Sequence, residues 1–245
     1  METNLARRVQ LGRKLISRQP ANSIPGHSFS DRGRQGIQVM TQELRVLVLG
    51  IGNVLWADEG FGVRAAEALA ERYDFPENVT VMDGGTQGLY LLPYLEQNDA
   101  LIVFDAVDYG LAPGTMKIVC DGDVPAFMGA KKMSLHQTGF QDVISTATLM
   151  GYCPEHLLLI GVQPVELEDF GGGLRDAVAA CIDPAIEIAL EELRDKFGIE
   201  PVLRESDNTR INVDAIGRDA YEGGRPTAED ACRIGDDRFF GVEGR

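Results

Sequence analysis

Short, mostly apolar runs recur through the middle of the chain, and most of them end at a glycine or an aspartate. The first, residues 46–49, reads Val-Leu-Val-Leu and is followed directly by Gly50. Similar runs stand at residues 79–82, 101–104, 115–119 and 157–161. Runs of this length bounded by turn residues are typical of buried strands, and they are far too short to cross a bilayer.

Segments with helical periodicity lie between these strands. In residues 61–72, apolar or small residues recur at helical spacing, with Arg64 and Glu67 opposite them. We expect further helices at 89–95, at 139–150 and, as one or two helices, in 174–197, where Asp183-Pro184 predicts an N-cap followed by a proline at the first helical position. The alternation predicts an α/β fold: a single-domain, three-layer sandwich in which helices flank a mostly parallel, twisted sheet.

The composition divides the chain into three regions. Residues 1–43 are predicted to be a basic, disordered extension, because residues 1–40 hold seven Lys and Arg against two acidic residues and lack apolar periodicity. Residues 44–198 are predicted to be the folded domain, and residues 199–245 an acidic, disordered tail. Met40 is an alternative start, since the folded pattern begins directly after it, and the arginine-rich beginning also fits an organellar transit peptide.

Charge and cysteine usage narrow the class of protein. The net charge is −15, which argues against nucleic acid or an anionic membrane as the partner, because binding phosphate needs a surplus of Lys and Arg. The four cysteines are scattered, without a C-x-x-C pair, and we expect free thiols in a cytoplasmic protein. They are Cys120, Cys153, Cys181 and Cys232.

Acidic residues follow three of the predicted strands. Asp58 and Glu59 stand in the loop after the first strand, Asp83 follows the second, and Asp105 follows the third. Because the carboxyl ends of parallel strands meet at one edge of the sheet, where open α/β folds bind their ligands, we expect a site there.

A nucleotide-binding module is one interpretation of the first loop. Gly50-x-Gly52 follows a strand, as in dinucleotide-binding proteins, but the third glycine of that motif is replaced by Leu55. Asp58 and Glu59 would also repel a pyrophosphate at the helix N-terminus.

A cation suits these carboxylates better, because like charges that converge in a cleft are costly unless something neutralises them. Of the three histidines, His27 lies in the extension and His156 directly precedes a strand, whereas His136 stands in a polar loop that opens a helix. Two carboxylates and one imidazole would suit Zn²⁺ or Ni²⁺. The plainer alternative is that the carboxylates cap helices and the histidine is a satisfied loop residue.

The loops resemble those of the hydrogenase maturation protease family, over about residues 44–197. The matching blocks are Gly50-Ile-Gly-Asn-Val-Leu with Asp58-Glu-Gly-Phe-Gly62, Asp83-Gly-Gly-Thr86, Asp105-Ala106, Pro113-Gly-Thr115, His136-Gln137 and Gly161-Val-Gln-Pro164. The loops look most like those of proteases that serve uptake hydrogenases.

The resemblance implies an activity, a partner and a set of site residues. It implies an endopeptidase, aspartyl-type or metallo-type, that removes the C-terminal extension of the [NiFe] hydrogenase large-subunit precursor after nickel insertion. Glu59, Asp105 and His136 match the family's metal-contacting residues, and Asp83 matches a supporting or catalytic carboxylate. Nickel would arrive with the precursor, and zinc or cadmium would fit the same site in vitro. The alternative is a nickel-dependent maturation chaperone without peptidase activity.

Overall fold

A computed structural model describes residues 44–128, 137–205, 211–212 and 216–223. The predicted extension at residues 1–43, the predicted metal ligand His136, and Cys232 all lie outside these residues.

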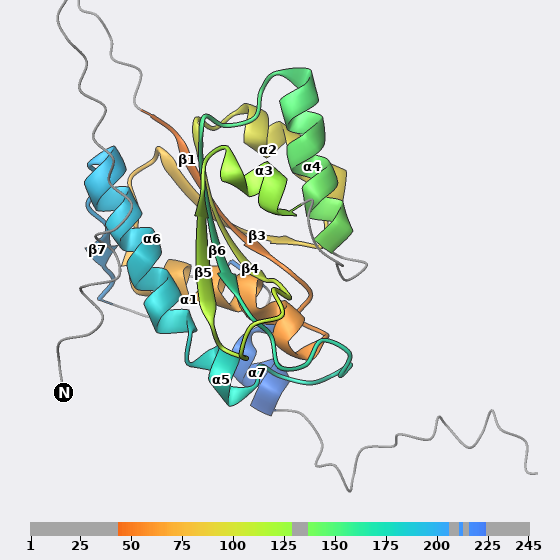
Figure 1. Ribbon diagram of the computed structural model, residues 1–245. Coiled ribbons are helices and arrows are strands. Elements are labelled where there is room, and N and C mark those ends of the chain that lie inside the picture. The colour runs from red at the N-terminus through yellow and green to blue at the C-terminus, as the bar shows by residue number, and fades with distance from the viewer. Residues whose placement is uncertain (1–43, 129–136, 206–210, 213–215, 224–245) are drawn as a thin grey trace, which may run out of the picture. The chain divides into compact units, whose positions relative to one another are not determined.

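The core of the fold is a five-stranded sheet (Figure 1). Its strands are β1 (Val46–Ile51), β3 (Val79–Gly85), β4 (Ala100–Ala106), β5 (Met116–Cys120) and β6 (His156–Val162). They lie in the order β3-β1-β4-β6-β5, with all neighbours parallel except β5, which runs antiparallel to β6. The mostly parallel sheet that the sequence predicts is thus confirmed.

Helices cover both faces of the sheet (Figure 1). One face packs against α1 (Phe61–Arg72), α5 (Asp176–Ala179) and α6 (Ile182–Phe197). The other packs against η3 (Gly88–Leu91), α2 (Leu92–Glu96), α3 (Asp123–Met128) and α4 (Gln137–Met150). This is the predicted three-layer sandwich.

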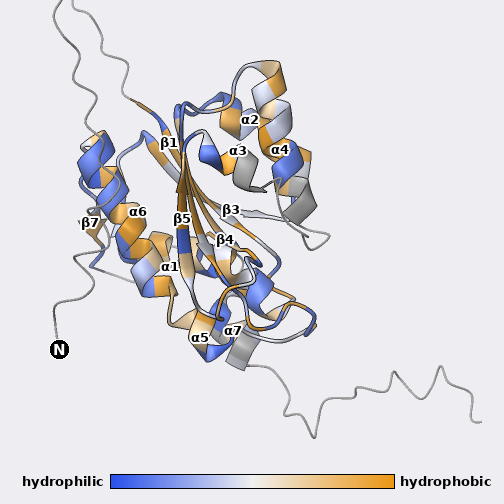
Figure 2. Ribbon diagram, viewed as in Figure 1, coloured by the Kyte–Doolittle hydropathy of each residue, from blue (hydrophilic) through white to orange (hydrophobic). Residues whose placement is uncertain are grey.

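Burial on both faces explains why the central strands β1, β4 and β6 are almost continuously apolar (Figure 2). In β1, Val46 and Val48 join the core under α1 and α6, whereas Leu47 and Leu49 join the core on the opposite face. All four side chains are fully buried, so no position in this strand tolerates a polar residue at low cost.

Helix α1 starts directly against the sheet because residue 62 is a glycine. A Cβ atom at Gly62 would lie 2.2 Å from the backbone oxygens of both Ile51 and Phe104. The second glycine of the Glu59-Gly60-Phe61-Gly62 stretch therefore permits the close approach of helix to strands, which sets the position of the loop before it.

One predicted helix start is wrong. The sequence predicts Asp183 as an N-cap, but α6 begins at Ile182, and its N-cap residue, Cys181, makes no side-chain capping bond. The backbone is already helical at Cys181, so Asp183 falls in the first turn, where its carboxylate pairs with Arg72 of α1.

The structure differs from the predicted tail for part of residues 199–245. There, β7 (Val202–Leu203) pairs antiparallel with β2 (Tyr73–Asp74), and α7 (Arg218–Gly223) forms a short helix. None of the helices in the described ranges is long and apolar enough to span a membrane.

Candidate active site at the carboxyl edge of the sheet

The loop after β1 folds back on itself before it enters η2 (Ala57–Gly60). The backbone N–H of Asn53 donates to the carbonyl oxygen of Glu59 at 3.2 Å, and the N–H of Glu59 donates to that of Trp56 at 2.9 Å. A Cβ at Gly52 would lie 1.8 Å from the Glu59 oxygen. Because the chain's own backbone occupies the space beside Gly52, a phosphate has no bare cradle there, which disfavours nucleotide binding.

Asp58 organises the protein rather than facing a ligand. Its side chain is fully buried. Its Oδ2 accepts hydrogen bonds from the backbone N–H groups of Val165, at 2.8 Å, and Glu166, at 2.9 Å, and its Oδ1 accepts one from Arg175 at 2.7 Å. Asp58 therefore holds the loop that follows β6 against the loop that follows β1. The sequence placed Asp58 and Glu59 together as cleft carboxylates, but only the contacts separate their roles.

Glu59 and Asp105 come together from two neighbouring strands. Asp105 lies near the end of β4 and is 2 % exposed, and Glu59 is 9 % exposed. Burial raises the pKa of Asp105 well above its ordinary value, and the negative charge of Glu59 raises it further, against the lowering effect of a hydrogen bond from the N–H of Ala106. The two carboxylates thus lie close enough that the negative charge of Glu59 disfavours the ionised form of Asp105.

These two carboxylates supply oxygen atoms of the kind that bind divalent cations. Oδ2 of Asp105 is buried and has no hydrogen-bond partner among the described residues, so it is available to an incoming group. Within the described ranges, no three His, Cys, Asp or Glu side chains form a group that could hold a metal ion. The predicted third ligand, His136, lies outside those ranges. The described residues therefore supply two candidate metal ligands at this site, Glu59 and Asp105.

Asp83 occupies the same edge of the sheet but a different cluster. It lies near the end of β3, which is separated from β4 by β1. Burial raises its pKa, and the charge of Glu67 adds to this. Hydrogen bonds from the Asn212 side chain and the Gly85 backbone, together with the charge of Arg64, lower it. The charges that act on Asp83 are thus those of α1, whereas the charge that acts on Asp105 is that of Glu59.

Tyr109 and Gln163 are site residues that sequence reasoning did not single out. Gly161 is the register partner of Asp105 in β6, and a Cβ at Gly161 would lie 2.0 Å from Oη of Tyr109. The Tyr109 hydroxyl therefore lies beside Asp105, and burial together with the charge of Asp105 raises its pKa. Oε1 of Gln163 accepts from the N–H of Tyr109 at 2.7 Å and of Leu111 at 3.1 Å, which fixes this loop. The sequence contained Gln163 within the Gly161–Pro164 block of the resemblance, at the end of an apolar strand, but gave no signal for Tyr109.

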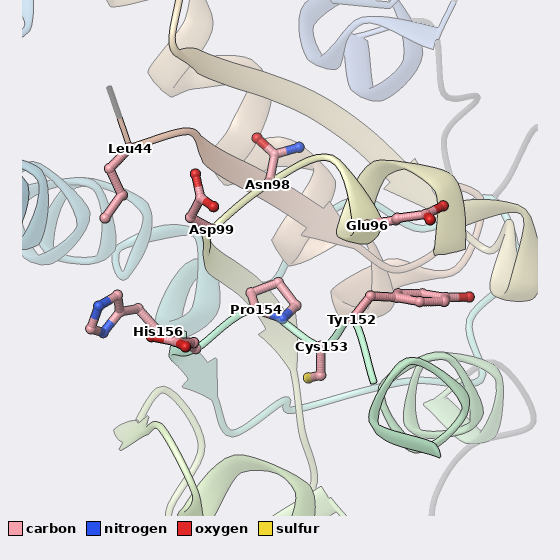
Figure 3. Close-up of a pocket in the computed structure, with 9 residues that line it drawn as sticks. Leu44, Glu96, Asn98, Asp99, Tyr152, Cys153, Pro154 and His156 are labelled. Carbon is pink, nitrogen blue, oxygen red and sulfur yellow. The ribbon is translucent and has the colours of Figure 1, made fainter. Parts of the chain in front are cut away.

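A pocket of about 440 Å³ lies at the opposite edge of the sheet, among residues that precede β1, β4 and β6 (Figure 3). His156, at the start of β6, lines it and packs edge-on against Phe197, with ring centroids 5.8 Å apart. The length of β6 separates His156 from the carboxyl edge of the sheet. His156 therefore cannot share a metal site with Glu59 and Asp105, in agreement with its predicted place directly before a strand.

Comparison with known proteins identifies relatives of this chain. A family model described as hydrogenase maturation protease matches residues 63–192, a range that includes Asp83, Asp105 and His136 and begins just after Glu59. The hydrogenase expression/formation protein HupD of Rhodobacter capsulatus is 65 % identical over 196 residues, which cover 80 % of this chain and 93 % of that protein. HoxM of Azotobacter vinelandii is 60 % identical over 195 residues, covering 80 % and 94 %.

A solved structure has the same fold. The hydrogenase maturating endopeptidase HybD from Escherichia coli superposes with a TM-score of 0.62 at 45 % identity, and the match covers 66 % of this chain and 98 % of that chain. The family model, these relatives and the shared fold show that the chain belongs to the hydrogenase maturation protease family.

Proposed function

We propose that this chain is an endopeptidase that removes the C-terminal extension of the large-subunit precursor of a [NiFe] hydrogenase after nickel has been inserted. The observation that supports it most directly is the meeting of Glu59 and Asp105, whose buried carboxylates face each other's charge at the carboxyl edge. A divalent cation would relieve that repulsion. A precursor without nickel would leave it in place, so recognition would depend on metal.

In this proposal Glu59, Asp105 and His136 complete the coordination of a nickel ion that arrives as part of the substrate. Carboxylate oxygens and an imidazole nitrogen are ligands that Ni²⁺ accepts, and the same set accepts Zn²⁺ or Cd²⁺ in vitro. Binding the ion would set the scissile peptide bond at a defined place, and positioning of this kind lowers a reaction barrier by several kcal/mol.

Proton transfer is proposed for Asp83. Its raised pKa brings a carboxyl group closer to the range in which it can both accept and donate a proton. A water attacking the peptide carbonyl would give up a proton, and the leaving amine would take one up. With carboxylates as the reacting groups and the metal in the substrate, the enzyme fits an aspartyl-type endopeptidase that requires a metal-loaded substrate.

The remaining features agree with a cytoplasmic reaction on a protein partner. Cys120, Cys153 and Cys181 are free, as expected where thiols stay reduced. The net charge of −15 disfavours a nucleic acid or an anionic membrane as the partner.

Cleavage of the purified precursor, loaded with nickel or free of it, tests the proposal. Wild-type protein should cleave only the nickel-loaded form. Glu59→Gln, Asp105→Asn and His136→Ala should each lose at least about 10- to 100-fold in cleavage rate, since even the loss of a group that only orients a metal ligand typically costs this much. Glu77→Gln, at an exposed position before β3, is the matched control and should cleave at the wild-type rate.

The outcomes separate the alternatives. Equal cleavage of both precursor forms would reject metal recognition, and full activity of the three variants would reject the assigned residues. Nickel-dependent binding of the precursor without cleavage would instead identify a maturation chaperone.

A further inference from the structure

Part of the predicted tail packs against helix α1 beside Asp83. The guanidinium of Arg64, a residue of α1 that is 3 % exposed, donates from Nη1 to the carbonyl oxygen of Ile216 at 2.6 Å. The same guanidinium lies 6.0 Å from the ring centroid of Tyr221 in α7. A buried arginine on an otherwise amphipathic helix is costly unless partners satisfy it, and residues 216–221 supply them.

Glu67 and Asn212 extend this contact into a network. Oε2 of Glu67 accepts from Nη1 of Arg64 at 2.7 Å, and its Oε1 accepts from Nδ2 of Asn212 at 2.7 Å. The Asn212 side chain also lies beside Asp83: both residues line one pocket, and the amide lowers the pKa of the Asp83 carboxyl group. One amide therefore bonds to Glu67 of α1 and lies near a second carboxylate close to the end of β3.

The same residues border the open space beside Asp83. A pocket of about 390 Å³ is lined by Asp83 and Asn212 together with Val81, Met82, Gln87 and Ile211. A second, of about 210 Å³, is lined by Asp83 and Ile216 together with residues of the loop after β1. A substrate that reaches Asp83 through either pocket would pass Asn212 or Ile216.

We propose that Asn212 is a positioning residue of the active site, which holds the Asp83 carboxylate toward these pockets and joins it to the Arg64–Glu67 ion pair. This inference rests on the proposed function, because it assumes that Asp83 takes part in peptide cleavage. Asn212 lies beyond residues 63–192, the range of the family match, so a residue outside that range would complete a site inside it.

The charges show why Asp83 needs this amide. The charged groups that act on it are Glu67, which opposes its ionised form, and Arg64, which favours it. Arg64 is already paired with Glu67, and Oδ1 of Asp83 is buried without a hydrogen-bond partner among the described residues. Without Asn212, the remaining hydrogen bond that favours the ionised carboxylate would be the one from Gly85.

Titration of the Asp83 carboxyl carbon, followed by NMR in the full chain and assigned with Asp83→Asn, tests the contact without any substrate. Asn212→Ala should raise the pKa of Asp83, because it removes a bond to the charged form. Glu67→Gln should lower it, because it removes a repelling charge; the amide keeps one acceptor oxygen where the carboxylate offered two. Asn98→Ala, whose amide donates to the Tyr94 carbonyl at the opposite edge, is the control and should leave it unchanged.

Cleavage of nickel-loaded precursor tests the role. In Asn212→Ala, the limb of the kcat/KM–pH profile that reports Asp83 should move to higher pH, with about three- to tenfold lower kcat/KM on the acidic side. In Glu67→Gln, the same limb of the kcat/KM–pH profile should move to lower pH.

An Asp83 titration that is the same in Asn212→Ala and wild type overturns the inference. So does a shifted titration with an unshifted pH profile. Absence of cleavage by wild-type protein rejects the proposed function instead, while the titration still decides whether Asn212 holds Asp83. If Asn212→Ala does not fold, Asn212→Leu, which keeps the size of the side chain but lacks the amide, takes its place, and an Asp83 titration identical to that of wild type then overturns the inference.

Discussion

The carboxylate of Asp58 accepts a hydrogen bond from the backbone N–H of Arg175 at 2.7 Å, across 117 positions of the sequence. With two further bonds from Val165 and Glu166, it ties together the loops that follow β1 and β6. The next residue, Glu59, is a candidate metal ligand. Its position therefore depends on Asp58, whose carboxylate accepts these three backbone hydrogen bonds.

Asp58→Asn should destabilise the protein by about 1–3 kcal/mol, because an amide leaves at least one of the three N–H groups that bond to Asp58 without an acceptor. Urea unfolding measures this. The control is Asp183→Asn, at an exposed ion pair with Arg72, which should cost less than about 1 kcal/mol. Equal small losses in the two variants would contradict the structural role of Asp58.

Gly62→Ala should destabilise the protein by about 1–3 kcal/mol, since the added methyl group would meet the backbone of two strands. Gly122→Ala is the matched control, because a Cβ there would meet nothing within 4 Å. Thermal or urea unfolding of both variants measures the stability that each one loses. A Gly62→Ala protein as stable as the control would mean that α1 does not lie this close to β1 and β4.

Asp105→Asn should abolish cleavage yet stabilise the metal-free protein by about 0.5–2 kcal/mol, a stability gain at the expense of function. The physical reason is that the substitution removes a buried charge beside Glu59. Asp142→Asn, at an exposed position in α4, should change stability by no more than about 0.5 kcal/mol. A destabilised Asp105→Asn protein would show that Asp105 has a structural partner.

Gly161→Ala should displace the Tyr109 ring and destabilise the protein by about 1–3 kcal/mol, because the new Cβ would overlap the hydroxyl. Adding Tyr109→Phe removes that hydroxyl and should restore part of the loss. A double-mutant cycle measured by urea unfolding gives the coupling between the two positions. Strict additivity would show that the hydroxyl does not lie over Gly161.

Asp83 should make stability depend on pH. The folded protein raises the pKa of Asp83 above its ordinary value of 3.8, so the folded state binds this proton more tightly than the unfolded state does. Its stabilising contribution is complete below pH 3.8 and is lost as pH rises through the folded pKa. The free energy of unfolding of wild type minus that of Asp83→Asn should therefore fall with rising pH over that interval. A rise would reverse the inferred direction.

Local patterns of apolar residues in the sequence predicted much of the fold. The apolar runs at residues 46–49 and 101–104 are strands because both faces of the sheet are covered, and that burial leaves a continuous signature. The sequence pattern did not predict the start of α6 correctly. The backbone is already helical at Cys181, so Asp183 lies in the first turn, where it pairs with Arg72, and it does not cap the helix. His136 remains a prediction, since it lies outside the described residues.

Residue types and strand ends were enough to indicate an acidic edge at which Glu59, Asp83 and Asp105 stand. Long-range contacts assigned the roles: they turned Asp58 toward backbone N–H groups, set Glu59 against Asp105, and joined Asp83 to Asn212. The reason is physical. Apolar periodicity is a local response to burial, whereas a hydrogen bond or a charge pair between distant residues leaves no trace in the sequence around either of them.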